Sequence, residues 1–135
     1  MPYATVQDLV DRFGEKEILQ LTDRDHTDEI DTEVAEQALD DASAEIDGYL
    51  DARRFKLPLE DVPRVLTRAA ADIARYRLYA TQAPETVKDR YEATLSWLKM
   101  LARGDVQLGI EVQPEARGAV SHSPGKGEFD DIEGF

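Results

Sequence analysis

The sequence predicts an all-α protein, a compact bundle of about four to five helices with a short β-strand and an extended C-terminal tail. Apolar residues recur at helical spacing through most of residues 5–103, and glycine or proline separates the periodic stretches. A strictly alternating apolar run follows at 106–112, and the remaining residues lose all periodicity. We therefore expect a helical domain at 1–104, followed at 105–135 by a strand-like segment and a flexible acidic tail.

Composition sets broad limits on this chain. Its 135 residues, 41% of them hydrophobic, suit one domain that buries about two-thirds of its unfolded surface. It has no cysteine, which excludes disulfides and thiolate zinc sites. No apolar stretch approaches the roughly 20 residues that span a bilayer, and the N-terminus lacks the basic and apolar regions of a secretory signal. We expect a protein that is cytoplasmic or assembled in the cytoplasm.

Two short helical segments are expected first. Thr5 is a candidate N-cap with Asp8 three residues later, and Gly14 ends the segment. The apolar residues of this segment are Val6, Leu9, Val10 and Phe13. A second apolar turn contains Ile18, Leu19 and Leu21. Residues 22–31 are polar and acidic, and we expect an exposed loop.

A long helix should begin with Thr32 as its cap. One buried stripe is expected from Ala35, Ala38, Leu39, Ala42, Ile46, Tyr49 and Leu50. The opposite face is acidic and carries Glu33, Glu36, Asp40, Asp41, Glu45, Asp47 and Asp51. Like-charge pairs one turn apart cost about 0.2–0.5 kcal/mol each in an isolated helix. This face is either simply solvated, or it faces DNA without gripping it, or it awaits an arginine partner.

An apolar elbow with Phe55, Leu57, Pro58 and Leu59 should lead to a helix whose first turn holds Pro63 and which runs to about Tyr79. The apolar side of this helix carries Leu66, Ala69, Ala70, Ile73, Tyr76 and Ala80. It is surrounded by four arginines, Arg64, Arg68, Arg75 and Arg77. We expect Asp72 to bridge Arg68 or Arg75 on the helix surface.

Pro84 should open the last helix, and Gly104 should end it. Its expected inner face is Val87, Tyr91, Leu95, Leu98 and Leu101 or Ala102. Trp97 lies off that line, where it fills an edge of the core or contacts a partner. The core of the whole domain is expected from Leu39, Ile46, Leu50, Leu66, Ile73, Leu95 and Leu98.

The C-terminal segment has two features that suggest partners. Val106, Leu108, Ile110 and Val112 alternate with other residues, which predicts a strand that pairs with a copy of itself or with another protein. The acidic tail, expected to be disordered alone, ends with Phe129, Ile132 and Phe135. These apolar anchors suggest docking into a basic-rimmed groove, although a solvated tail is the simpler alternative.

No pattern of catalytic residues is evident. His26 and His122 are the only histidines, and neither has a metal-ligand or nucleophile spacing around it. The acidic loop 23–31 lacks the central glycine and the last glutamate of a calcium loop, and 121–127 lacks the setting of a phosphate-binding loop. We expect neither an enzyme nor a bound metal or cofactor.

The net charge of −13 is unevenly distributed. Residues 1–61 carry 18 acids and 6 bases, whereas residues 62–103 carry 4 acids and 8 bases. Residues 104–135 again have an acidic excess, with 7 acids and 2 bases. Either these charges only face water, or acidic and basic faces meet between neighbouring copies, as a ring of identical subunits requires. In the second case, the expected interface residues are the basic Arg64, Arg68, Arg75 and Arg77 and the acidic Asp40, Asp47 and Asp51.

An ordered series of short motifs over about residues 3–102 resembles the Mu-like phage and prophage head–tail connector family, also described as head-completion or neck proteins. The motifs are YATVQDLV (3–10), RFG (12–14), ILQLTD (18–23), IDT (30–32), DASAEIDGYL (41–50), RFKLPL (54–59), VP (62–63) and DIARYRLY (72–79).

The resemblance implies a structural adaptor in the neck of the virion, assembled in the host cytoplasm as a ring that is usually twelve-fold. It implies contacts with the portal protein and with a downstream neck or tail-terminator protein, and double-stranded DNA that passes through without specific binding. An acidic tunnel wall would repel phosphates and let DNA slide. The alternative is an acidic DNA mimic that inhibits a nuclease or restriction enzyme, although the basic segment at 62–103 argues against it.

Overall fold

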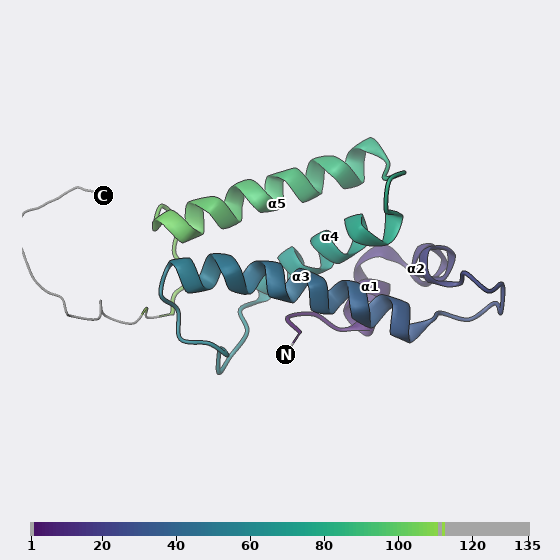
Figure 1. Ribbon diagram of the computed structural model, residues 1–135, viewed down its shortest axis with the longest axis horizontal. Coiled ribbons are helices and arrows are strands. Elements are labelled where there is room, and N and C mark those ends of the chain that lie inside the picture. The colour runs from purple at the N-terminus through teal and green to yellow at the C-terminus, as the bar shows by residue number, and fades with distance from the viewer. Residues whose placement is uncertain (1, 111, 113–135) are drawn as a thin grey trace, which may run out of the picture.

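The computed structural model describes residues 2–110 and 112, and its described part is helical (Figure 1). The helices are α1 (Val6–Phe13), α2 (Glu15–Thr22), α3 (Thr32–Ala52), α4 (Arg64–Tyr79) and α5 (Glu85–Arg103). No β-strand forms within the described residues. The all-α prediction and the expected number of helices are confirmed.

Three long helices build the body of the molecule. α4 packs against both α3 and α5, and α3 also contacts α5 (Figure 1). α1 and α2 pack against α3 and α4 near the start of α3. Leu39, Ile46, Leu50, Leu66, Ile73 and Leu98 are buried as expected, whereas Leu95 is only partly buried. Trp97 packs at the edge of this core.

The helix ends follow local chemistry. The backbone N–H of Asp8 donates to Thr5 Oγ1 at 3.1 Å, and the N–H of Thr5 donates to the Asp8 carboxylate at 2.8 Å, which confirms the capping pair. For α3 the expected cap is wrong by one residue. The Asp31 carboxylate accepts the N–H groups of Glu33 and Val34, and Thr32 is the first helical residue. A negative carboxylate suits the positive end of the helix dipole better than a hydroxyl does.

Glycine and proline mark the remaining boundaries. Pro63 and Pro84 occupy the N-cap positions directly before α4 and α5, so Pro63 precedes its helix instead of lying within the first turn. Gly104 has a φ of +86°, a left-handed conformation that stops α5, as predicted.

The alternating segment at 106–112 folds back on its own domain. Val112 forms one isolated antiparallel bridge with the buried Phe55 of the elbow between α3 and α4, where the Leu57–Pro58 peptide is cis. The segment's apolar side chains, Val106, Leu108, Ile110 and Val112, are half-buried against the core. The predicted strand is therefore wrong for the described residues: a single bridge forms, and the segment instead covers apolar surface of its own core.

Candidate subunit and partner interface

Arg75, one of the expected interface arginines, forms an ion pair within its own chain. Its Nε and a terminal nitrogen donate to the two carboxylate oxygens of Glu17 on α2, at 2.6 and 3.0 Å. Its guanidinium also lies 4.2 Å from the centre of the Phe13 ring. Burial opposes ionisation of Glu17, but the hydrogen bonds and charge of Arg75, with a hydrogen bond from Tyr79, lower its pKa. The pair clamps α2 to α4.

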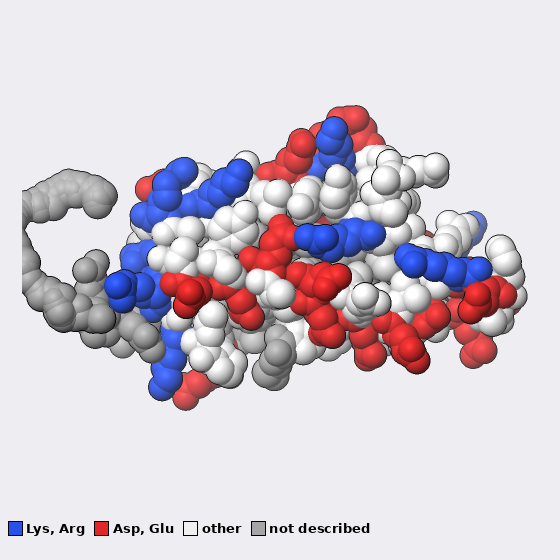
Figure 2. Space-filling model, viewed as in Figure 1, with Lys and Arg blue, Asp and Glu red and all other residues white. Residues whose placement is uncertain are grey.

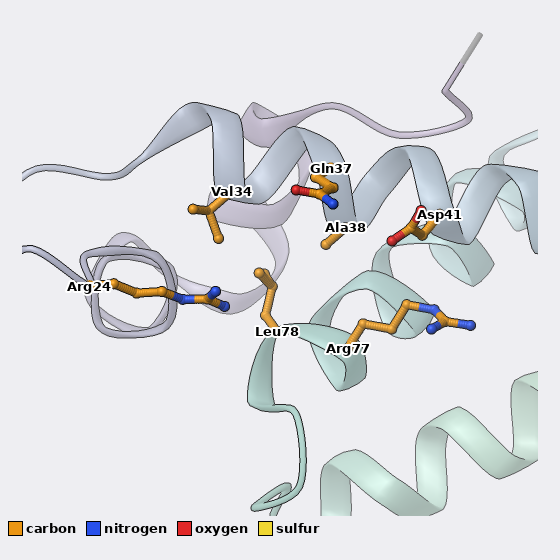
Figure 3. A pocket seen from close by; sticks show the side chains of 7 residues that line it. All are labelled: Arg24, Val34, Gln37, Ala38, Asp41, Arg77 and Leu78. Carbon is orange, nitrogen blue, oxygen red and sulfur yellow. The ribbon is translucent and has the colours of Figure 1, made fainter.

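Arg77 is committed in the same way, to Glu45 of α3. This ion pair lies beside a hollow of about 270 Å³, which is lined by Arg24, Val34, Gln37, Ala38, Asp41, Arg77 and Leu78 (Figure 3). In Figure 3 the Arg24 side chain reaches toward Leu78, while Arg77 runs below Asp41 on α3. The hydrogen bond and charge of Glu45 raise the pKa of Arg77. Arg77 therefore identifies the side of α4 that faces α3.

The N-terminal residues form a strap across α3 and α4. Tyr3 donates its backbone N–H to Ser43 Oγ at 2.9 Å, and its carbonyl accepts from Thr67 Oγ1 at 2.9 Å. The Tyr3 hydroxyl donates to Asp47, and burial together with this carboxylate raises the pKa of Tyr3. Asp47, an expected interface acid, is therefore engaged inside the domain.

Asp72 does not form the surface ion pair that was expected with Arg68 or Arg75. Asp72 is only 7% exposed, and no lysine or arginine nitrogen of the described residues lies within 4.0 Å of its carboxylate. Thr94 of α5 donates a long hydrogen bond to it at 3.5 Å. Burial raises the pKa of Asp72, and the charges of Arg90, Arg68 and Arg75 oppose that rise only in part. The bridge fails because α5 packs over Asp72 while Glu17 takes Arg75.

The carboxyl of Asp72 lies in a hollow of about 320 Å³ between α4 and α5. We call it the α4–α5 pocket, and its lining residues are Arg68, Asp72, Arg90, Ala93 and Thr94. Arg68 and Arg90 are exposed, and neither forms an ion pair with another described residue. Arg64 is also exposed, one turn before Arg68.

The exposed acids of α3 lie on the other side of the molecule. Arg68 is nine residues before Arg77, which places the two about half a turn apart around α4 at roughly 100° per residue. Because Arg77 faces α3, Arg68 points away from it. Asp40 and Asp51 are exposed, on the side of α3 opposite its buried stripe. The chain thus carries basic and acidic faces on opposite sides of one helical core.

Figure 2 shows this uneven charge on the face that carries α3. Acidic side chains extend along α3, and basic side chains gather at the end of the molecule where α5 ends. The ends of α3 and α5 meet there, since Arg53 lies against Gly104. The basic residues of these helix ends and the adjoining elbow are Arg53, Arg54, Lys56, Lys99 and Arg103.

The other expected interface residues divide into two groups. Val106, Leu108 and Ile110 contact their own core, so they are only partly available to a partner. Phe129, Ile132 and Phe135 lie outside the described residues. Sequence reasoning missed Tyr3, Glu17 and Arg90, because each is defined by a neighbour far away in the sequence.

Within the described residues, no group of three or more histidine, aspartate or glutamate side chains is arranged to hold a metal ion. Asp23 of the acidic loop instead accepts the backbone N–H groups of Thr27 and Asp28, at 2.7 and 2.8 Å. None of the helices in these residues has the length and apolar character needed to cross a bilayer.

Comparison with known proteins gives consistent matches. The model of the family described as Bacteriophage Mu, Gp36 matches residues 3–123. Gene product J of Escherichia phage Mu is 42% identical over 117 residues, which cover 86% of this chain and 82% of that protein. Mu-like prophage FluMu protein gp36 of Haemophilus influenzae is 35% identical over 127 residues, covering 91% of this chain and 89% of that protein.

Proposed function

The chain belongs to the Bacteriophage Mu Gp36 family, and on this basis we propose that it is a structural head–tail connector of a Mu-like phage particle. In this role, copies of the chain form a ring below the portal, at the neck of the virion, through which double-stranded DNA passes. The portal is the partner above the ring, and a neck or tail-terminator protein is the partner below it.

The position of the charged faces supports the ring that this role requires. The α4–α5 pocket with its arginines and the exposed acids of α3 lie on opposite sides of one small helical body. A closed ring of identical copies needs such a heterologous pair of surfaces, one for each neighbour. A two-fold dimer would instead need one self-complementary patch.

The acidic surface also suits passage of DNA. Carboxylates that line a channel repel phosphates, so they prevent the counterion-releasing contacts through which basic proteins bind DNA. Exposed acids such as Glu33 and Glu36 on α3 can supply this lining where they are not covered by a neighbour.

Deletion of the gene from an inducible Mu-like prophage tests the role directly. We expect DNA-filled heads and separate tails in electron micrographs, with joined particles restored by the gene in trans. Labelling of the complemented particles should place the protein at the neck. Normal joined particles without the protein, or label confined to the tail tip, would refute the proposal.

The exposed acids of α3 also favour a second candidate, a DNA mimic that inhibits a nuclease. A mimic presents a continuous acidic face, whereas basic side chains interrupt the face in Figure 2. A nuclease-inhibition assay with the purified chain separates the two functions, because a connector leaves nuclease activity unchanged.

A further inference from the structure

The α4–α5 pocket is one negative charge short of neutrality. The exposed Arg68 and Arg90 line it with their charges unpaired among the described residues, and the buried Asp72 is the pocket's own carboxylate. Both guanidiniums act on Asp72 through space, although neither forms an ion pair with it. Two positive groups and one buried negative group leave room for one more carboxylate.

The acidic side of α3 can supply that carboxylate from another copy. Asp40 is exposed near the middle of α3, it has no ion pair among the described residues, and it lies one turn after the exposed Glu36. Within the described residues, no ion pair offsets the repulsion between Glu36 and Asp40. Among the other acids of α3, Glu45 pairs with Arg77 and Asp47 with Tyr3, and Asp41 lines the hollow beside Arg77.

We propose that Asp40 of one copy enters the α4–α5 pocket of the next copy and pairs with Arg68 and Arg90. This inference rests on the proposed ring and names its contact between neighbours. The pocket and Asp40 lie on opposite sides of the chain, so the contact propagates from copy to copy in one direction. Arg75 and Arg77, which are paired within the chain, are excluded from it.

Charge reversal in two separate proteins tests the pairing. Arg68→Glu/Arg90→Glu and Asp40→Lys should each weaken self-association more than about tenfold in sedimentation velocity, because like charges then face each other at every contact. An equal mixture of the two should assemble again, since each reversed pocket meets a lysine and each normal pocket meets an aspartate. Lys16→Glu/Lys99→Glu, with the same change of net charge at exposed sites, is the control and should assemble like wild type.

Cysteine cross-linking tests the direction of the contact, and the absence of native cysteine removes any background. Ala93 lines the pocket, and Ala44 lies one turn after Asp40 on the exposed side of α3. The full-length Ala44→Cys/Ala93→Cys protein should form a ladder of linked species beyond the dimer on mild oxidation. Each single cysteine variant should stay unlinked.

The outcomes separate this contact from the proposed function. Wild-type rings with no ladder, or reversals that assemble like wild type, would overturn the Asp40 contact and leave the connector role standing. Dimers linked by a single cysteine would also overturn it, because they indicate a two-fold contact. Particles that join normally without the protein would refute the connector role itself, whatever the cross-links show.

Discussion

The ion pair between Glu17 and Arg75 is expected to be one of the main interactions that hold α2 against the helical core. Its side chains are 23% and 17% exposed, and two hydrogen bonds join them at 2.6 and 3.0 Å. A hydrogen bond to a charged group contributes about 1.5–3 kcal/mol when it is shielded from water. We expect Glu17→Gln and Arg75→Met each to lower the free energy of unfolding by about 2 kcal/mol.

A double-mutant cycle isolates the interaction. The doubly substituted protein should lose little more than either single variant, because both unpaired charges are then absent, and the coupling energy should reach about 1.5–2 kcal/mol. The same cycle on Glu45 and Arg77 should give less than about 1 kcal/mol, since the Arg77 side chain is 41% exposed and screened by solvent. Urea denaturation followed by circular dichroism measures all of these values.

Acid should remove the same stabilisation. The folded-state pKa of Glu17 is lowered, so its contribution is present above the ordinary glutamate value and is lost as pH falls through the lowered pKa. Wild type and Glu17→Gln should therefore differ most near pH 7 and converge in strong acid. A coupling energy below about 0.5 kcal/mol, with parallel pH profiles, would show that solvent screens this pair and that α2 is held by apolar contacts instead.

Three further changes test other parts of the structure. Ile73→Ala removes a fully buried side chain and should cost about 2–5 kcal/mol in urea denaturation, whereas a loss below about 0.5 kcal/mol would contradict its place in the core. Asp72→Asn should raise the free energy of unfolding at pH 7, because burial raises the folded-state pKa of this carboxyl. This gain in stability should shrink as pH falls toward the ordinary aspartate pKa of about 3.9 and vanish below it. A gain that persists at pH 2 would point to a different cause. Truncation after Pro114 should leave the melting temperature nearly unchanged but abolish stable attachment to filled heads, and a truncated protein that still attaches would show that the tail has no docking role.

Most of the helical architecture could be predicted because it depends on near neighbours. The capping pair of Thr5 and Asp8, the stop at Gly104 and the buried stripe with Ile46 each involve residues within a few positions of one another. Hydrogen bonding within a helix and the 3.6-residue repeat act over this same range, so the sequence pattern carries their signal.

The candidate interface could be predicted only in outline, and Asp72 shows why. Its spacing from Arg68 and Arg75 suggested a surface bridge, but Glu17, 58 residues before Arg75, takes that arginine. Helix α5 then covers Asp72 with Thr94 and brings Arg90 into reach. The segment at 106–112 was likewise predicted only in part. Its alternation indicated a strand, but the described residues form a single bridge, between Val112 and Phe55.

The amino-acid sequence by itself determined the helices, the capping pair of Thr5 and Asp8, the separation of acidic and basic segments and the membership in a Mu-like family. Tertiary structure decided which charges are already satisfied, namely Arg75, Arg77 and Asp47, and which face outward, namely Arg68, Arg90 and Asp40. The reason is physical: an ion pair depends on distance and on exclusion of water, and both are set when helices remote in sequence pack together.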